Sequence, residues 1–327
     1  MPYLVGLLAV SVTTAGNVLF IWFLDRFEKD PIWLLALVFL WGAVPSIIIA
    51  GTLNTLFAFS FYTMFDPYLA SGLTASLVAP PVEETAKGLA LLLVFVTLRH
   101  RFTDVLAGII FGAIIGAGFA WVEDITYIFR EFERGGMETM AGVFVLRVFI
   151  FGLNHAFFTA LTGLGFGLAR QTRGCFTGGL AVLSFFGLAM GAHFLHNFLV
   201  SFFGNAGALL SFLIHWAGVF GLLVVVVVAW IYQWKWIKAE LREEVELGNI
   251  GERDYRQVSK WFGRLGWELR FLFAFDLKGF MRIRKMFNQL VHLAFLKRSN
   301  RRHPEERTAH RIEEARSRIM FIRRKFV

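Results

Sequence analysis

The feature that most constrains this chain is a succession of long apolar stretches joined by short polar connections. Of its 327 residues, 57% are hydrophobic and 17% are charged, whereas soluble domains carry roughly 25% charged residues. A helix needs about 20 mostly apolar residues to cross a bilayer. The stretches that meet this requirement are residues 3–24, 32–62, 71–98, 105–129, 141–169, 175–203 and 207–234. The sequence therefore predicts an all-α, polytopic membrane protein with about seven transmembrane helices.

The distribution of Lys and Arg between short connections predicts the orientation, because cytoplasmic loops carry an excess of both residues. The connections that we place in the cytoplasm are the basic segments 25–30, 98–104 and 170–174. Those that we place outside are the neutral or acidic segments 64–72, 129–140 and 201–207. We therefore expect a multi-pass protein of the cell membrane with an external N-terminus and a cytoplasmic C-terminus.

The C-terminal part differs in composition from the rest. Residues 237–327 contain 22 Lys and Arg against 12 Asp and Glu, a net charge of +10, whereas residues 1–236 sum to −1. We predict a transmembrane domain over 1–236 and a basic, helical cytoplasmic extension over 237–327. The basic extension is interpreted either as a solvated face or as a surface attracted to anionic lipids. No nucleic-acid-binding motif accompanies the charge, so no nucleic acid is expected.

Ionisable side chains recur inside the apolar stretches, although each costs about 2.5–3.5 kcal/mol at mid-membrane on insertion scales. Converted at 1.5 Å per residue, their positions fall at one depth, between the midplane and the outer interface. They come from four predicted helices and are Glu83, Glu84, Glu123, Asp124, His155, His193 and Asn197. A common depth in four helices indicates one shared polar site.

The spacing within each helix repeats as well. Residues four apart stack on one helical face, and the pairs with this spacing are Glu83 and Lys87, Phe119 and Glu123, Phe151 and His155, and His193 and Asn197. Small residues at the same spacing predict close helix approach; they are Gly108, Gly112, Gly116 and Ala120 on one helix, and Thr159, Gly163 and Gly167 after His155 on the next. Pro80 and Pro81 favour a helix start just before the glutamates.

A carboxylate beside histidines in a dry pocket is suited to activating water as a general base. A His–Asn pair one turn apart can direct two donors at a developing oxyanion. Together these groups favour peptide hydrolysis without a covalent intermediate. The sequence contains no G-x-S-x-G, paired transmembrane aspartates or H-E-x-x-H, which are typical of serine, aspartyl and zinc peptidases. The single cysteine, Cys175, excludes a disulfide within the chain and a Cys-based zinc site.

Four motifs in order carry a resemblance to a known family: E-E-x-x-K at 83–87, "GFAWVED" at 118–124, "FGLNH" at 151–155 and "HFLHN" at 193–197. Over about residues 1–235 the chain resembles the PrsW family of intramembrane proteases. That family is related to the glutamic-type CAAX prenyl endopeptidases and to bacteriocin-immunity membrane proteins. The resemblance implies a bacterial membrane protease that cuts a membrane-anchored protein, such as an anti-sigma factor, near the outer face.

The resemblance also implies roles for individual residues. Glu83 or Glu84 is the catalytic base, and which of them it is stays open. His155 helps to hold the water, while His193 and Asn197 polarise the scissile carbonyl. Lys87 and Glu123 are supporting residues, and the roles of Glu123 and His155 are open to exchange.

Two other functions remain open at this level. In a metal-dependent protease, Glu83, Glu84, His155 and His193 would be the ligands, although no two histidines have the four-residue spacing of H-E-x-x-H on one helix. We expect no cofactor, with a divalent metal as the alternative. The non-enzymatic alternative is a transporter or immunity-type protein that uses the same charges as a relay. Transporters commonly contain internal repeats, and none is visible here.

Overall fold

The computed structural model describes residues 1–327 except 100, 173, 262–265, 267, 268, 272, 303, 305 and 325–327. Residues 262–265, 267, 268, 272, 303, 305 and 325–327 of the predicted basic extension thus lie outside the described residues. The described part of the chain is helical and contains no strand, which confirms the all-α class. Contacts divide it into two units, Met1–Asp25 with Asp30–Val226, and Arg26–Lys29 with Val227–Val327. The domain boundary at 236/237 stays a prediction.

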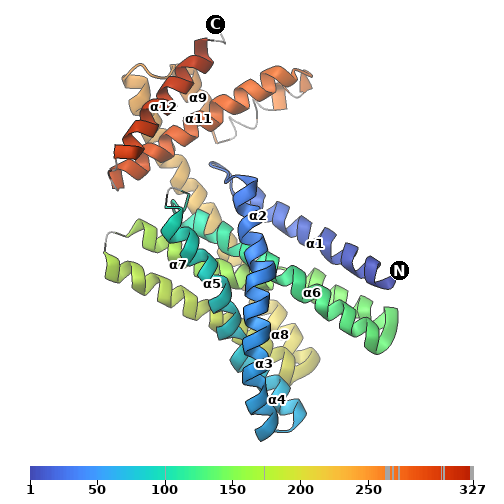
Figure 1. Ribbon diagram of the computed structural model, residues 1–327. Coiled ribbons are helices and arrows are strands. Elements are labelled where there is room, and N and C mark those ends of the chain that lie inside the picture. Colours follow the sequence, from blue (N-terminus) through green and yellow to red (C-terminus); the bar gives the residue numbers. More distant parts are fainter. Residues whose placement is uncertain are drawn as a thin grey trace. The chain divides into compact units, whose positions relative to one another are not determined.

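The first unit consists of long helices and three short π-helical segments (Figure 1). Its helices are α1 (Pro2–Leu24), α2 (Ile32–Trp41), α3 (Ile47–Met64), α4 (Pro67–Leu73), α5 (Ala79–Thr97), α6 (Val105–Val143), α7 (Asn154–Gln171) and the part of α8 (Cys175–Glu246) up to Val226. The π-helical segments are η1 (Gly42–Ser46), η2 (Thr74–Val78) and η3 (Phe144–Ile150). The stretches that are long and apolar enough to cross a membrane are Pro2–Leu24, Ile32–Met64, Val105–Gln171 and Cys175–Glu246. These stretches agree with a polytopic membrane protein, and the number of seven crossings stays a prediction.

Two of the long helices are interrupted at glycines. Gly136 in α6 has φ 72° and Gly204 in α8 has φ 53°. This left-handed conformation is readily adopted by glycine but is unfavourable for residues with a Cβ. The interruptions lie inside the predicted outer connections 129–140 and 201–207, so the predicted ends of these apolar stretches coincide with real breaks in the helices.

Helices α6 and α7 are in backbone contact, as the spacing of small residues predicts. A Cβ atom on Gly108 would lie 2.1 Å from the carbonyl oxygen of Gly163, and one on Gly112 would lie 2.4 Å from that of Thr159. At Gly116 the carbonyl oxygen of His155 would be 2.1 Å away. Three successive turns therefore require glycine on α6, and this close approach places His155 against the polar end of α6.

The start of α5 differs in part from its prediction. Pro80 and Pro81 do lie in the first turn of α5, but the chain enters that turn through the π-helical segment η2. The backbone of Val78 stays helical, with φ −94° and ψ −51°. The prolines thus mark a change of helical register rather than a new helix. Pro45 is likewise associated with a π-helical register, because it lies inside the π-helical segment η1.

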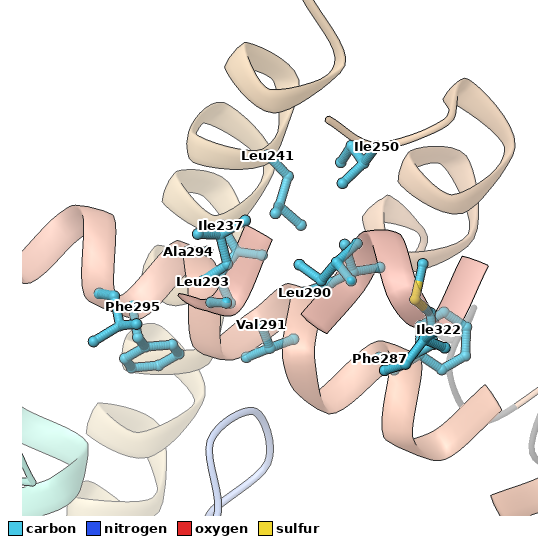
Figure 2. Close-up of a cluster of buried hydrophobic side chains, with 14 of the residues drawn as sticks. Ile237, Leu241, Ile250, Phe287, Leu290, Val291, Leu293, Ala294, Phe295 and Ile322 are labelled. Atoms are coloured by element: carbon cyan, nitrogen blue, oxygen red, sulfur yellow. The ribbon is translucent and has the colours of Figure 1, made fainter. Parts of the chain in front are cut away.

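The second unit has a hydrophobic core of its own (Figure 2). It is built from residues 227–246 of α8 together with α9 (Glu252–Ser259), α11 (Leu277–Arg302) and α12 (Glu306–Arg324). Leu241 and Leu290 are fully buried in this core. Next to it, the carboxylate of Glu244, also fully buried, accepts hydrogen bonds from Lys297, Arg316 and Asn249. The described part of the basic extension is therefore packed around both an apolar core and a buried ion cluster.

Candidate active site

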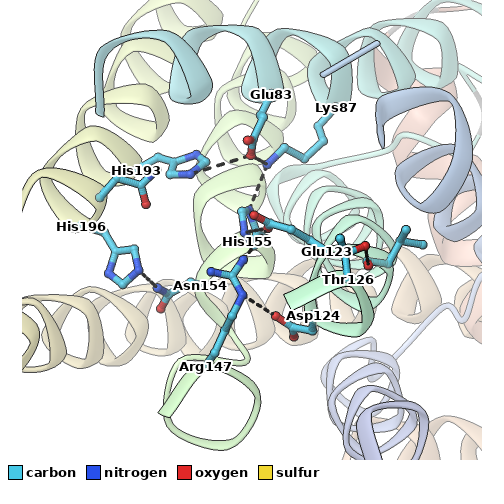
Figure 3. Close-up of polar contacts among 12 residues, drawn as sticks. Glu83, Lys87, Glu123, Asp124, Thr126, Arg147, Asn154, His155, His193 and His196 are labelled. Carbon is cyan, nitrogen blue, oxygen red and sulfur yellow. Dashed lines mark hydrogen bonds and ion pairs between the residues drawn. The ribbon is translucent and has the colours of Figure 1, made fainter. Parts of the chain in front are cut away.

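The first unit contains a cavity of about 670 Å³ that is lined by polar side chains from α3, α5, α6, η3, α7 and α8. The predicted site residues that line it are Glu83, Glu123, His155, His193 and Asn197. Glu84 and Lys87 are completely buried immediately behind Glu83. Figure 3 shows Glu83, Lys87, His155 and His193 converging from three helices. The structure therefore brings together all seven residues that the sequence selects.

Glu84 has hydrogen-bond partners for both of its carboxylate oxygens. Its Oε1 accepts from Nζ of Lys87 at 2.6 Å and lies 3.0 Å from Nδ1 of His193. Its Oε2 accepts from the hydroxyl of Thr159 at 3.1 Å. With 0% of its surface exposed, this carboxylate is held by α5, α7 and α8 and has no open face toward the cavity.

Glu83 is placed differently, although it is the adjacent residue on the same helix. Its Oε1 accepts a long hydrogen bond of 3.4 Å from Asn54. Its Oε2 is buried, and no described residue hydrogen-bonds to it. Nζ of Lys87 and Nε2 of His193 form ion-pair contacts with Oε2, each at 3.8 Å, which is beyond hydrogen-bonding distance. Glu83 thus lines the cavity, and its Oε2 is unpaired in the sense that no described residue donates a hydrogen bond to it.

The partners of His155 determine which ring nitrogen carries its proton. Nδ1 lies 3.2 Å from Nζ of Lys87, and an ammonium group can only donate. Nδ1 must therefore accept, so we assign the proton of the neutral ring to Nε2. That atom is in ion-pair contact with Oε2 of Glu123 at 2.7 Å, and an ionised carboxylate has no hydrogen to donate. Both nitrogens of His155 are committed in this arrangement.

The same reasoning applies to His193. Its Nδ1 faces the carboxylate of Glu84 at 3.0 Å, so Nδ1 donates and Nε2 of the neutral ring carries a lone pair. Nε2 is the atom that lies 3.8 Å from Glu83. The ring is held flat against Phe158, with centroids 4.8 Å apart and an interplanar angle of 14°. His193 therefore offers an acceptor beside the unpaired oxygen of Glu83.

Asn197 lies one turn further along α8 and binds the irregular start of α5. Its Nδ2 donates to the carbonyl oxygen of Ala75 at 2.8 Å. This carbonyl lies in η2, where the amide of Ala79 donates to Thr74 instead, and the following Pro80 has no N–H. The carbonyl oxygen of Ala75 thus receives from one N–H of Asn197 the hydrogen bond that the helix backbone does not supply. The second N–H of Asn197 stays available for another acceptor.

The charged residues of the cavity that are not among the predicted site residues are Asp124, Arg130, Glu131 and Arg147. Arg147 from η3 forms ion pairs with Glu123 at 2.7 Å and with the buried Asp124 at 2.9 Å. Asp124 was placed at the common depth by the sequence, but without a role. The signal for Arg147 was present in the sequence, because an arginine inside the apolar stretch 141–169 is costly unless it has an acidic partner.

Glu83, His155 and His193 each offer one ligand atom, and these atoms lie within 4.8 Å of one another. Two histidines and one glutamate form a donor set that is typical of catalytic zinc. The positions of the neighbouring atoms disagree with such an ion. Zinc bonds nitrogen at about 2.0–2.1 Å, so an ion on Nδ1 of His155 would meet the Lys87 ammonium, which lies 3.2 Å from that nitrogen. The other nitrogen faces Glu123. The donor types fit a metal, but their arrangement around Lys87 does not.

Comparison with known proteins identifies relatives of this chain. A family model described as "PrsW family intramembrane metalloprotease" matches residues 30–232. The protein called "Protease PrsW" of Clostridioides difficile (strain 630) is 36% identical over 107 residues, which are 33% of this chain and 43% of that relative. The match thus spans less than half the length of that relative. No solved structure matches the chain.

Proposed function

This chain belongs to the PrsW family of intramembrane proteases, and on that basis we propose that it hydrolyses a peptide bond in a membrane-anchored protein with water activated by Glu83. The observation that carries the proposal concerns Glu83, which lines the cavity: no described residue hydrogen-bonds to its Oε2, which lies 3.8 Å from Nε2 of His193. A separation of this size is suited to a bridging water molecule. Glu84 is unsuited to this role because its oxygens already accept from Lys87 and Thr159.

Each proton transfer of the proposed reaction can be assigned to one of these residues. A water molecule donates one hydrogen to Oε2 of Glu83 and the other to Nε2 of His193. As Glu83 takes the first proton, the water oxygen forms a bond to the scissile carbonyl carbon. Glu83 then passes this proton to the peptide nitrogen as the carbon–nitrogen bond breaks, which yields a carboxylic acid and an amine.

The developing oxyanion needs a donor, and we assign this role to the second N–H of Asn197. Its first N–H is anchored on Ala75, which fixes the orientation of the amide before substrate arrives. Preorganised donors of this kind contribute about 2.7–4 kcal/mol to transition-state stabilisation. His193 holds the water through an acceptor, so Asn197 rather than His193 polarises the carbonyl in this mechanism.

No resident metal takes part in the proposed reaction. The positive charge closest to the base is the Lys87 ammonium, 3.8 Å from Oε2 of Glu83. It also holds Glu84 and contacts His155. The family description names a metalloprotease, so the activity that remains after removal of metal from the purified protein distinguishes the two mechanisms.

The substrate, the orientation and the lipid partner are part of the same proposal. The substrate is a membrane-anchored protein, for example an anti-sigma factor, cut near the outer face. The C-terminal unit is cytoplasmic, where its basic extension attracts anionic lipids. These three statements follow from the family resemblance and from the charges of the connecting segments and of residues 237–327.

The direct test is cleavage of a reporter with one transmembrane segment by the purified protein in a bilayer. Glu83→Gln removes the base but keeps the size of the side chain, so we expect a loss of at least about 100-fold in rate. Glu131→Gln is the matched control, because Glu131 lines the same cavity but pairs with Arg134. Wild-type cleavage by the Glu83 variant would refute the proposal.

A further inference from the structure

Arg147 lines the cavity but has no part in the hydrolysis as proposed above. It comes from η3, and its guanidinium reaches two consecutive acidic residues of α6. Nη2 lies 2.7 Å from Oε2 of Glu123, and Nε lies 2.9 Å from Oδ1 of Asp124. The guanidinium carbon is also 3.8 Å from the ring centroid of Tyr127. Three contacts to a single helix therefore hold this group in one position, and Figure 3 shows the one with Asp124.

The geometry of these contacts requires arginine. Glu123 and Asp124 are neighbours on a helix, so their side chains point about 100° apart. A planar guanidinium can reach two carboxylates through different nitrogens at once, whereas an ammonium acts as a single point charge. Asp124 is buried, with 4% of its surface exposed, and anchors Nε. Nη2 is thereby presented to Glu123.

Glu123 links Arg147 to the water-activating centre. Its Oε2 is shared, because Nη2 of Arg147 and Nε2 of His155 both lie 2.7 Å from it. A carboxylate at this position keeps the proton of His155 on Nε2, which leaves Nδ1 free to accept from Lys87. Lys87 is in turn 3.8 Å from the unpaired oxygen of Glu83.

We infer that Arg147 is a positioning residue that fixes Glu123 and, through it, the Nε2-protonated tautomer of His155. This inference rests on the proposed function only where it links Lys87 to the base. If Arg147 is removed, Glu123 keeps one neutral donor and is free to turn into the cavity that it lines. His155 then populates both tautomers, and the one protonated on Nδ1 turns an N–H toward the Lys87 ammonium, which cannot accept it.

Arg130 is a matched control within the same cavity. Its guanidinium carbon lies 4.3 Å from the ring centroid of Tyr127, the ring that Arg147 also covers. Its ion pair is with Glu131 at 3.6 Å. Arg130→Ala therefore removes a cationic group from the same cavity and from the same ring, and it leaves the Arg147 contacts with Glu123 and Asp124 intact.

The test combines nitrogen NMR of histidine-labelled protein in bilayers with cleavage kinetics. The His155 signal is identified by its loss in His155→Ala. We expect wild type and Arg130→Ala to show Nε2 protonation, and Arg147→Ala to show a mixture of tautomers. For Arg147→Ala we also expect kcat to fall on the order of 100-fold with KM unchanged. An unchanged tautomer in Arg147→Ala would overturn the inference even if the protein proves inactive on the reporter.

Arg147→Lys covers the case in which the alanine variant fails to accumulate. Lysine keeps a positive charge beside the two carboxylates but cannot reach both, so we expect the second tautomer to appear with a smaller loss of kcat. Because Arg147 acts through Glu123, its removal should cost little in a Glu123→Gln background. Additive losses in the double variant, or a single tautomer in Arg147→Lys, would show that Arg147 acts independently of His155.

Discussion

The Lys87 ammonium and the Glu84 carboxylate form an ion pair of 2.6 Å in which neither side chain is exposed. Removing one partner of a buried pair leaves the other uncompensated and typically costs about 3–5 kcal/mol. We therefore expect Glu84→Gln to lower the thermal stability of the membrane-embedded unit. Glu83→Gln should leave stability close to wild type, because Oε2 of Glu83 has no hydrogen-bond partner among the described residues. Thermal unfolding and reporter cleavage, measured on both variants, distinguish the catalytic role of Glu83 from the structural role of Glu84. Equal destabilisation by both would contradict this division.

Metal removal tests the role assigned to Lys87. In the proposed mechanism Glu83 is the general base and the Lys87 ammonium is the cation of the site, so no step requires a metal ion. Prolonged dialysis of the purified protein against a chelator should therefore leave the rate of reporter cleavage within about 2-fold of that of the untreated sample. Elemental analysis of the same sample should find less than one equivalent of zinc or another divalent metal. A loss of activity that zinc restores would instead assign Glu83, His155 and His193 as ligands.

The contact between α6 and α7 predicts that alanine substitutions at Gly116 and Gly191 have different effects on stability and activity. A Cβ on Gly116 would lie 2.1 Å from the backbone oxygen of His155, whereas no atom lies within 4 Å of one on Gly191. Overpacking of this kind costs about 1–3 kcal/mol, and here it also displaces His155. Gly116→Ala should therefore lose both stability and cleavage, while Gly191→Ala should keep both. The measurement is thermal unfolding together with reporter cleavage, and a wild-type Gly116→Ala protein would contradict the close approach.

The buried ion cluster of the second unit predicts a dependence of its stability on pH. Burial by itself would raise the pKa of Glu244, but hydrogen bonds from Arg316, Lys297 and Asn249 outweigh it and lower the pKa from 4.5 to about 2. Because the folded-state pKa is the lower one, this stabilisation is fully present above about pH 4.5. It disappears as the pH falls toward 2.

Glu244→Gln should remove this pH dependence and cost about 3–5 kcal/mol at neutral pH. Hydrogen exchange of α11 amides in the full chain, corrected for the intrinsic rate at each pH, reports the change. Glu246→Gln is the control, since Glu246 is 66% exposed at its side chain and lies 3.7 Å from Arg242. We expect that exposed pair to contribute less than about 1 kcal/mol. Similar exchange rates in both variants would show that the Glu244 cluster does not stabilise this unit.

The charges of the short connections predict the orientation in the membrane. A reporter enzyme that is active only in the cytoplasm should be active when it is fused to the C-terminus. The same enzyme inserted at Gly135, next to the break at Gly136, should be inactive. The reverse result would place the polar residues of the cavity near the inner face instead.

The sequence by itself determined the features that depend on local composition and spacing. Long apolar stretches predicted an all-α membrane protein, because a helix in lipid must satisfy its backbone within itself. Glycines four residues apart predicted a helical face suited to close backbone approach, since a helical face repeats at that interval. The seven predicted site residues came from the cost of polar groups in lipid and from the resemblance, and the structure brings them together.

Only the tertiary structure decided what each of these residues contacts. The i,i+4 spacing favours a contact between Glu83 and Lys87, but in the structure Lys87 hydrogen-bonds to Glu84. Thr159 and His193, from two other helices, also contact the Glu84 carboxylate, whereas no described residue hydrogen-bonds to Oε2 of Glu83. Arg147 is 23 residues from Asp124 along the chain, and the break at Gly136 lies between them. Spacing along one helix indicates which side chains share a face. Which side chains of different helices contact each other depends on how helix breaks and close backbone contacts orient those faces.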